Sequence, residues 1–173
     1  MQAGSGTCFE ELMSSAYEIA QSATPADLAD IARLFQLYAD TLPINLDYQD
    51  FETELSSLPG KYAPPEGALF LARNGDGHAI GCVGIRPLEI PGLCEMKRLY
   101  TLPTSRGIGL GRGLTKAVIE CVRALGYSEM RLDTLASMTA AIRLYEQHGF
   151  RPCAPYYAPT PAGTVFMALK LET

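Results

Sequence analysis

The sequence predicts one mixed α/β domain, and three features carry this expectation. The chain has 173 residues, which is close to the size of a single domain. Of these residues, 47% are hydrophobic and 19% are charged, a composition typical of a protein that builds its own core. The expected elements follow the order strand, helix, helix, three strands, helix, strand, helix, strand. This order implies antiparallel strands early in the chain and a β-α-β unit late.

The first 15 residues show neither the basic start nor the apolar core of a secretory signal. We expect a flexible N-terminal extension over residues 1–15 and the domain over residues 16–173. No apolar run approaches the 18 residues or so of a transmembrane helix, so a cytoplasmic protein without a membrane partner is expected. The five cysteines include no C-x-x-C pair, which favours reduced thiols and no metal site.

Local patterns justify each early element. Thr24 and Pro25 supply an N-cap and a first-turn proline for the first helix. The segment Asn74-Gly75-Asp76-Gly77 is typical of a hairpin turn between two strands. Pro59 and Gly60 end the second helix. The early strands and helices are therefore expected over residues 17–22, 25–41, 48–58, 68–73, 79–85 and 94–102.

The later elements show clearer periodicity. An apolar stripe from Leu110 through Leu114 and Val118 to Leu125 predicts an amphipathic helix, and Gly126 is a suitable residue to end it. The remaining elements are an alternating strand, a second amphipathic helix and a last alternating strand, over residues 129–135, 137–148 and 164–171.

The formal net charge of −5 is unevenly distributed. Residues 1–80 carry 3 basic and 12 acidic side chains, a net charge of −9, whereas residues 81–173 carry 11 basic and 7 acidic side chains, a net charge of +4. Nucleic acid is not an expected partner, because such binding usually needs an overall basic surplus. The basic second half can hold a small polyanion, although simple drift in surface composition is an equal alternative.

Four glycines lie between Gly107 and Gly113, where a strand leads into a helix. Without Cβ atoms, such a turn can bring backbone N–H groups at a helix N-terminus against a phosphate, and Arg106 and Arg112 add charged donors. The spacing matches neither the P-loop nor the dinucleotide-binding fingerprint. A tight corner with no ligand is the alternative explanation.

Three segments, over residues 95–114, 125–135 and 140–150, together resemble the GNAT superfamily of acyl-CoA-dependent N-acetyltransferases. The family's pyrophosphate signature, R/Q-x-x-G-x-G/A, is matched by Arg106, Gly109 and Gly111. The resemblance covers about residues 16–171. It implies a GNAT fold, with a central mixed and largely antiparallel sheet of about six or seven strands, flanked by about four helices and splayed between strands 4 and 5.

The resemblance also implies acetyl-CoA as co-substrate and no metal. The pantetheine arm would lie in the gap between strands 4 and 5, bonded like an extra strand partner, and the glycine-rich turn would hold the pyrophosphate. The implied cofactor-binding residues are Leu99, Tyr100, Thr101, Arg106, Gly107, Gly109, Leu110, Gly111, Arg112 and Gly113.

Two catalytic residues follow from the same resemblance. Tyr145 matches the position that faces the CoA sulfur, where its phenol can act as general acid; a core tyrosine is the alternative. Glu95 approximately matches a strand glutamate that serves as general base in some members. An ion pair of Glu95 with Lys97 or Arg98, without a catalytic role, is equally open.

The acceptor pocket is expected around residues 42–50, with help from the late loop. Further candidate site residues are Asp47, Asp50, Cys94, Asp133, Thr134, His148, Tyr156 and Tyr157. For most of them a solvated or purely structural role is the stronger alternative. For Thr134, a contact with pantetheine or with the acceptor remains open.

The resulting hypothesis is an N-acetyltransferase that moves an acetyl group from acetyl-CoA to a primary amine of a small molecule or protein by direct attack. Two alternatives are a non-catalytic acyl-CoA-binding or sensing domain on the same fold, and an interaction module in which the glycine-rich turn is only structural. A hydroxyl acceptor is a third variant. The resemblance also makes a homodimer a reasonable expectation.

Overall fold

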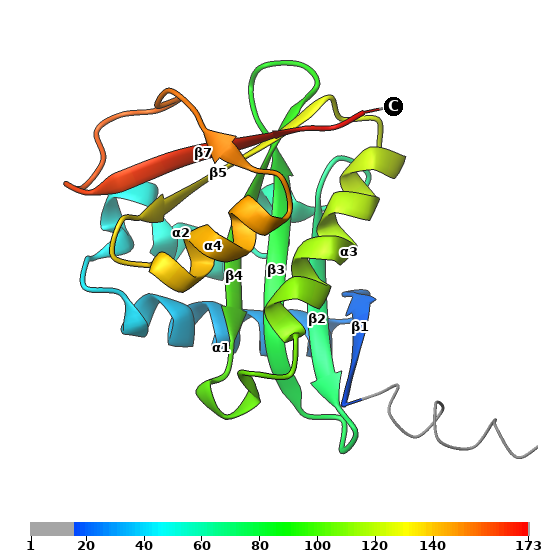
Figure 1. Ribbon diagram of the computed structural model, residues 1–173. Helices are drawn as coiled ribbons and strands as arrows, with labels where there is room; N and C mark the ends of the chain where they lie inside the picture. Colours follow the sequence, from blue (N-terminus) through cyan, green and yellow to red (C-terminus); the bar gives the residue numbers. More distant parts are fainter. Residues whose placement is uncertain (1–15, 173) are drawn as a thin grey trace, which may run out of the picture.

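The computed structural model describes residues 16–172, and within them the chain forms a seven-stranded sheet with helices on both faces (Figure 1). The expected extension over residues 1–15 lies outside the described residues. In chain order the elements are β1 (Tyr17–Gln21), α1 (Pro25–Thr41), η2 (Leu46–Gln49), α2 (Phe51–Ser56), η3 (Gly60–Tyr62), β2 (Ala68–Asn74), β3 (Ala79–Pro87), β4 (Leu93–Thr101), η4 (Pro103–Ser105), α3 (Leu110–Ala124), β5 (Glu129–Leu135), α4 (Thr139–Gln147), β6 (Arg151–Pro152) and β7 (Thr164–Lys170), where η marks short 3-10 helices.

The strands lie in the order β1-β2-β3-β4-β5-β7-β6, and β4 and β5 are the parallel neighbours in an otherwise antiparallel sheet. This parallel pairing is short. It begins at Leu93 opposite Glu129 and ends at Glu95 opposite Arg131. Beyond that point β4 and β5 diverge, as Figure 1 shows. The predicted splay between strands 4 and 5 is therefore confirmed.

A β-bulge in β4 accompanies the divergence. Gly84 of β3 lies opposite Lys97, and Cys82 lies opposite Tyr100, so two residues of β4 face one residue of β3. Arg98, one of the two, has a φ of 61°, in the left-handed region. A bulge bends its strand and increases the local twist. The bulge thus turns the second half of β4 away from β5.

The capping pattern at α1 is confirmed. The Thr24 hydroxyl accepts a hydrogen bond from the Asp27 amide at 3.1 Å, and the Asp27 carboxylate accepts one from the Thr24 amide at 3.2 Å. This reciprocal capping box satisfies two donors that a helix N-terminus otherwise leaves free. Hydrogen bonds from the Ala23 amide, from Arg73 and from Thr24 lower the Asp27 pKa from 3.8 to about 2.

Two features differ from the sequence-based expectation. The single helix expected over residues 48–58 is two shorter ones, η2 and α2, separated by Asp50. Asp50 has a φ of 54°, a left-handed conformation that interrupts a right-handed helix. The strand β6 was not predicted, because its two residues are too few to show any alternation.

Two clusters of apolar side chains fill the two faces of the sheet. On one face, the predicted stripe of α3, including Leu114 and Val118, packs against the sheet residues Ile85 and Met130. On the other face, α1 contributes a second cluster together with Tyr62. Each large side chain buried in this way contributes roughly 1.5–3 kcal/mol. The layers hold the sheet from both sides, so the gap between β4 and β5 is a fixed part of the fold.

Candidate active site

A cavity of about 470 Å³ lies where β4 and β5 separate. Residues 96–101 of β4 and 132–135 of β5 line it, together with parts of α1, η2 and α4. Within residues 16–172, the edge of β4 that faces β5 has no strand partner beyond Glu95. Leu99, Tyr100 and Thr101 lie on this segment, so their main chain can pair with an extended ligand as a further strand would.

The glycine-rich turn lies at the other end of this cavity. Gly107 and Gly109 have φ values of 83° and 79°, a conformation that residues with a Cβ rarely adopt. Gly109 is the N-cap of α3 and offers no side chain to the amides of the first turn. The first bond of the helix runs from the Gly113 amide to the Gly109 carbonyl at 2.9 Å. Within residues 16–172, the amides of Leu110, Gly111 and Arg112 therefore stay available to an anion.

The arginines and glycines of this turn differ in their surroundings. Arg106 is exposed and lines the cavity. Arg112 is also exposed, and its Nη2 donates a hydrogen bond to Gln147 at 3.3 Å. Packing explains why residue 113 is a glycine, because an added Cβ would lie 2.8 Å from the Tyr17 hydroxyl of β1. Its amide already donates within the helix, so the available donors lie earlier in the turn.

Tyr145 of α4 lines the cavity and is 7% exposed. Within residues 16–172, no group forms a hydrogen bond with its hydroxyl. Burial raises the Tyr145 pKa well above its ordinary value of 10, and the phenol of Tyr38 and the carboxylate of Asp133 add to the rise. The hydroxyl is therefore protonated at neutral pH and open to a ligand.

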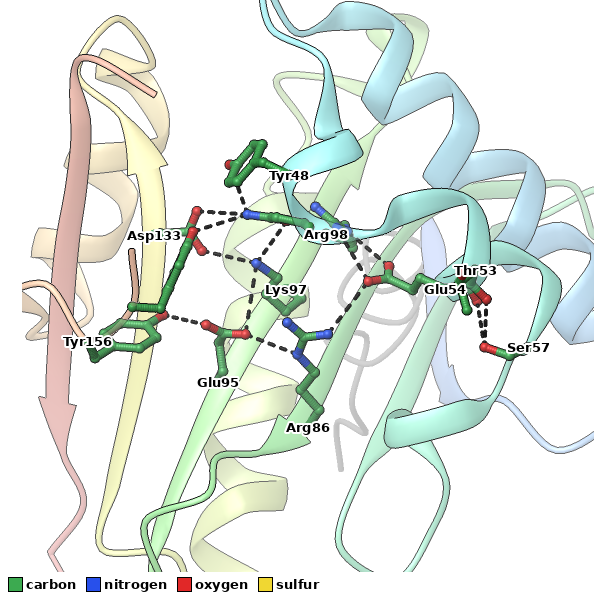
Figure 2. A network of polar contacts seen from close by, with 12 residues as sticks. Tyr48, Thr53, Glu54, Ser57, Arg86, Glu95, Lys97, Arg98, Asp133 and Tyr156 are labelled. Carbon is green, nitrogen blue, oxygen red and sulfur yellow. Dashed lines mark hydrogen bonds and ion pairs between the residues drawn. The ribbon is translucent and has the colours of Figure 1, made fainter. Parts of the chain in front are cut away.

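A polar cluster of Gln49, Lys97 and Asp133 lines the same cavity (Figure 2 shows the two charged members). The Lys97 ammonium donates to Asp133 Oδ1 at 3.0 Å and to Gln49 Oε1 at 3.2 Å. Gln49 in turn donates to the hydroxyls of Tyr48 and Tyr157, at 2.9 and 3.1 Å. Burial opposes ionisation of Asp133, but Lys97, Tyr157 and Arg98 together outweigh it and lower the Asp133 pKa. Asp133 and Lys97 thus form a charged pair in the cavity wall.

Glu95 lies beside this cluster and is 2% exposed. Its Oε1 accepts a hydrogen bond from Arg86 Nε at 3.0 Å and lies 3.8 Å from the Lys97 ammonium. Its Oε2 accepts one from the Tyr156 hydroxyl at 2.5 Å. Both carboxylate oxygens are engaged, as Figure 2 shows. Glu95 itself is not among the residues that line the cavity.

The ion pairs around Glu95 and Lys97 extend to Glu54, Arg86 and Arg98, and the positive and negative charges of this network are equal in number. Arg98 does not pair with Glu95; its Nε and Nη2 donate to the two oxygens of Glu54 at 3.0 and 3.2 Å. Arg86 bridges the two groups, with an Nη1 that lies 3.6 Å from Glu54. Three cations therefore face three carboxylates, including the pair of Lys97 and Asp133. Glu54 and Arg86 belong to no motif, and no local pattern indicates that α2 and β3 bring them together.

The segment expected to form the acceptor pocket does line the cavity, but its acidic residues do not. Tyr48 and Gln49 line the cavity, whereas Asp47 and Asp50 are exposed and do not. Thr134 also lines it, with a hydroxyl that contacts the Met138 sulfur at 3.6 Å.

Two other candidates lie outside the cavity. A ring nitrogen of His148 lies 2.9 Å from the Leu144 carbonyl, at the end of α4. Burial raises the Cys94 pKa to about 12, so its thiol is not a nucleophile at neutral pH. Among the residues that the structure describes, no three His, Cys, Asp or Glu side chains gather as metal ligands. No helix in residues 16–172 has the length and apolar character needed to cross a membrane.

Comparison with known proteins identifies the family of this chain. A model of the acetyltransferase (GNAT) family matches residues 31–150. An uncharacterized N-acetyltransferase of Schizosaccharomyces pombe is 43% identical over 148 residues, which cover 86% of this chain and 91% of that protein.

Solved structures share the fold. A candidate acyl-CoA N-acyltransferase from Klebsiella pneumoniae is 33% identical, with a TM-score of 0.69 over 90% of this chain and 98% of that one. A candidate acetyltransferase from Salmonella typhimurium, solved with acetyl-CoA, has a TM-score of 0.66 at 22% identity, over 91% of this chain and 95% of that one. With the family model covering most of the domain, the chain belongs to the acetyltransferase (GNAT) family and is an N-acetyltransferase.

Proposed function

We propose that this protein transfers the acetyl group of acetyl-CoA to a primary amine by direct attack. One observation carries the proposal: the cavity between β4 and β5 extends from the start of α3, whose first amides have no hydrogen-bond partner within residues 16–172, to Tyr145, whose hydroxyl has none there either. The amides can bind the pyrophosphate of acetyl-CoA, and the hydroxyl can serve its thioester at the other end of the molecule. The Salmonella protein with the same fold contains acetyl-CoA.

The residues present fit this co-substrate. The unpaired edge of β4 at Leu99 to Thr101 suits the amides of a pantetheine arm. The amides of Leu110 and Gly111 and the side chain of Arg106 suit the pyrophosphate, because backbone donors, helix dipole and guanidinium all favour negative charge there. Acetyl-CoA supplies the acetyl group as an activated thioester.

Tyr145 supplies the proton that the leaving group needs. As the amine nitrogen bonds to the acetyl carbon, the carbon–sulfur bond breaks and the sulfur takes the bonding electron pair. Tyr145 donates its phenolic proton to that sulfur. The nitrogen loses one proton to the general base, so that the amide product is neutral. The raised pKa keeps Tyr145 protonated until the thiolate forms. Free thiol and an acetamide are the products.

Glu95 is the general base of this proposal. Because Glu95 does not line the cavity, the proton of the amine would reach it through intervening water. The contacts with Arg86 and Lys97 also give this carboxylate a structural role. The two roles make different predictions.

Glu95→Gln is expected to lower kcat by about 10²-fold or more and to remove the limb of the pH–rate profile that the base produces at low pH. The amide keeps the shape of the side chain but cannot take the proton. Rates over a wide pH range measure both effects. Glu129→Gln is the matched control, because Glu129 is a half-buried carboxylate paired with an arginine on the same sheet. A profile of unchanged shape in a folded Glu95→Gln protein removes Glu95 as base and leaves it as a positioning residue.

The direct test of the proposed function is turnover with a panel of primary amines. Release of CoA thiol and formation of the acetamide, detected by mass spectrometry, are expected in equal amounts. The same panel includes alcohols of matching shape. Acetyl-CoA binding without turnover of any acceptor would favour a sensing domain, and esters in place of amides would assign a hydroxyl acceptor.

A further inference from the structure

We propose that Lys97 determines acceptor specificity: by occupying Asp133, it selects a weakly basic amine on an apolar or aromatic body and rejects polycationic amines. The inference rests on the proposed function and adds the class of acceptor. It begins with the charges of the cavity wall. Among the described residues that line the cavity, Asp133 is the one carboxylate.

Asp133 is not free to bind an ammonium group. Its Oδ1 accepts from Lys97 at 3.0 Å, and its Oδ2 lies 3.4 Å from the donating amide of Gln49. The side chains of Lys97 and Asp133 are 4% and 11% exposed, so solvent screens the pair little. A cationic acceptor would have to displace Lys97 from Asp133, its shortest ionic contact, and leave that buried lysine with the Gln49 oxygen at 3.2 Å and Glu95 at 3.8 Å, which is unfavourable.

No other carboxylate of the network compensates. Glu54 is held by Arg98 and Arg86, and Glu95 is held by Arg86 and Lys97. Asp47 and Asp50 lie nearby in sequence but are exposed, where water and salt weaken their attraction. Around Asp133 the cavity wall is therefore charge-balanced, because Lys97 and Arg98 each have a carboxylate partner.

Apolar and aromatic side chains make up much of the remaining cavity lining, beside polar residues such as Thr41, Arg98 and Thr134. The apolar and aromatic surfaces gain free energy by contact with an apolar body and cannot solvate additional charges. Apolar and aromatic side chains that line this part of the cavity are Tyr38, Leu42, Ile44, Leu46, Tyr48 and Leu132. An α-amine, with a pKa of about 8, is neutral far more often at pH 7.5 than an alkylamine such as that of lysine, at about 10.4. Such an amine can enter without a counter-ion.

The test compares phenylalaninamide, which has an α-amine on an aromatic body, with spermidine, an aliphatic polycation. For the wild-type enzyme we expect kcat/KM for phenylalaninamide to exceed that for spermidine by about tenfold or more. Lys97→Met frees Asp133, so KM for spermidine is expected to fall by about tenfold or more relative to the wild type. Lys116→Met is the control, because Lys116 is an exposed lysine of α3 and should leave both values unchanged.

The double variant Lys97→Met with Asp133→Asn separates specificity from structure. It removes both charges and keeps the wall neutral, so the wild-type preference for phenylalaninamide should return. If Lys97→Met does not fold, Lys97→Gln, which also removes the positive charge beside Asp133, is measured in its place. A wild-type enzyme that acetylates spermidine more efficiently, or a folded Lys97→Met protein with an unchanged preference, overturns the inference alone. Absence of CoA release with every amine overturns the proposed function and this inference together.

Discussion

Replacing Tyr145 with phenylalanine is expected to lower kcat by about 10²–10⁴-fold, the contribution typical of a positioned general acid. The substitution removes one hydroxyl and keeps the ring, which packs against Phe150 with centroids 5.8 Å apart. Acetyl-CoA should therefore bind as before, with a Kd within about twofold of wild type. Steady-state rates with a verified amine and calorimetric binding of acetyl-CoA measure the two quantities separately.

Tyr127→Phe serves as the control for this substitution. The Tyr127 hydroxyl donates to the Glu66 carbonyl at 2.6 Å, and Tyr127 does not line the cavity. Its loss should reduce the free energy of unfolding by about 1 kcal/mol and leave kcat unchanged. A Tyr145→Phe enzyme that retains full kcat would show that the leaving thiolate takes its proton from another source.

Arg106→Glu is expected to raise the Kd for acetyl-CoA by about 10- to 100-fold, because a hydrogen bond to a charged group contributes about 1.5–3 kcal/mol. Arg106 is exposed and borders the free amides of α3, so the change should not unfold the protein. The reversed charge would also repel the pyrophosphate. The difference between variant and wild type should shrink as salt is added, since ions screen exposed charges.

Arg123→Glu has the same change in net charge at the opposite end of α3, where the side chain is also exposed. It should bind acetyl-CoA with nearly wild-type affinity. Comparable weakening in both variants would mean that the total charge of the protein, not the position of Arg106, governs binding. An Arg106→Glu protein with wild-type affinity would place the pyrophosphate elsewhere.

The glycine-rich turn was predictable from sequence because its physical demands are local. Gly107 and Gly109 adopt positive φ values that few other residues accept, and the helix start follows at once. The apolar stripe of α3 is equally local. The divergence of β4 and β5 was expected from the family resemblance, and the bulge at Arg98 provides its physical cause.

The acceptor end of the cavity was less predictable because it is made by contacts between distant segments. Gln49, Lys97 and Asp133 come from η2, β4 and β5, and their pairing depends on the register of the sheet. The sequence places the pocket near residues 42–50 and favours solvated roles for Asp47 and Asp50, which are exposed. It suggests Lys97 only as a partner of Glu95, whereas the shorter contact of Lys97 is with Asp133.

Thermal unfolding of the wild-type protein with acetyl-CoA, CoA, ATP and NAD, each at the same concentration, tests the central claim most directly. A ligand at about a hundred times its Kd adds roughly 2.7 kcal/mol to the free energy of unfolding, which raises Tm by about 5–10 °C for a domain of this size. We expect this rise with acetyl-CoA and CoA and little change with ATP or NAD. Unchanged Tm with both CoA compounds at saturating concentration would contradict the assignment of the cavity between β4 and β5 as an acetyl-CoA site.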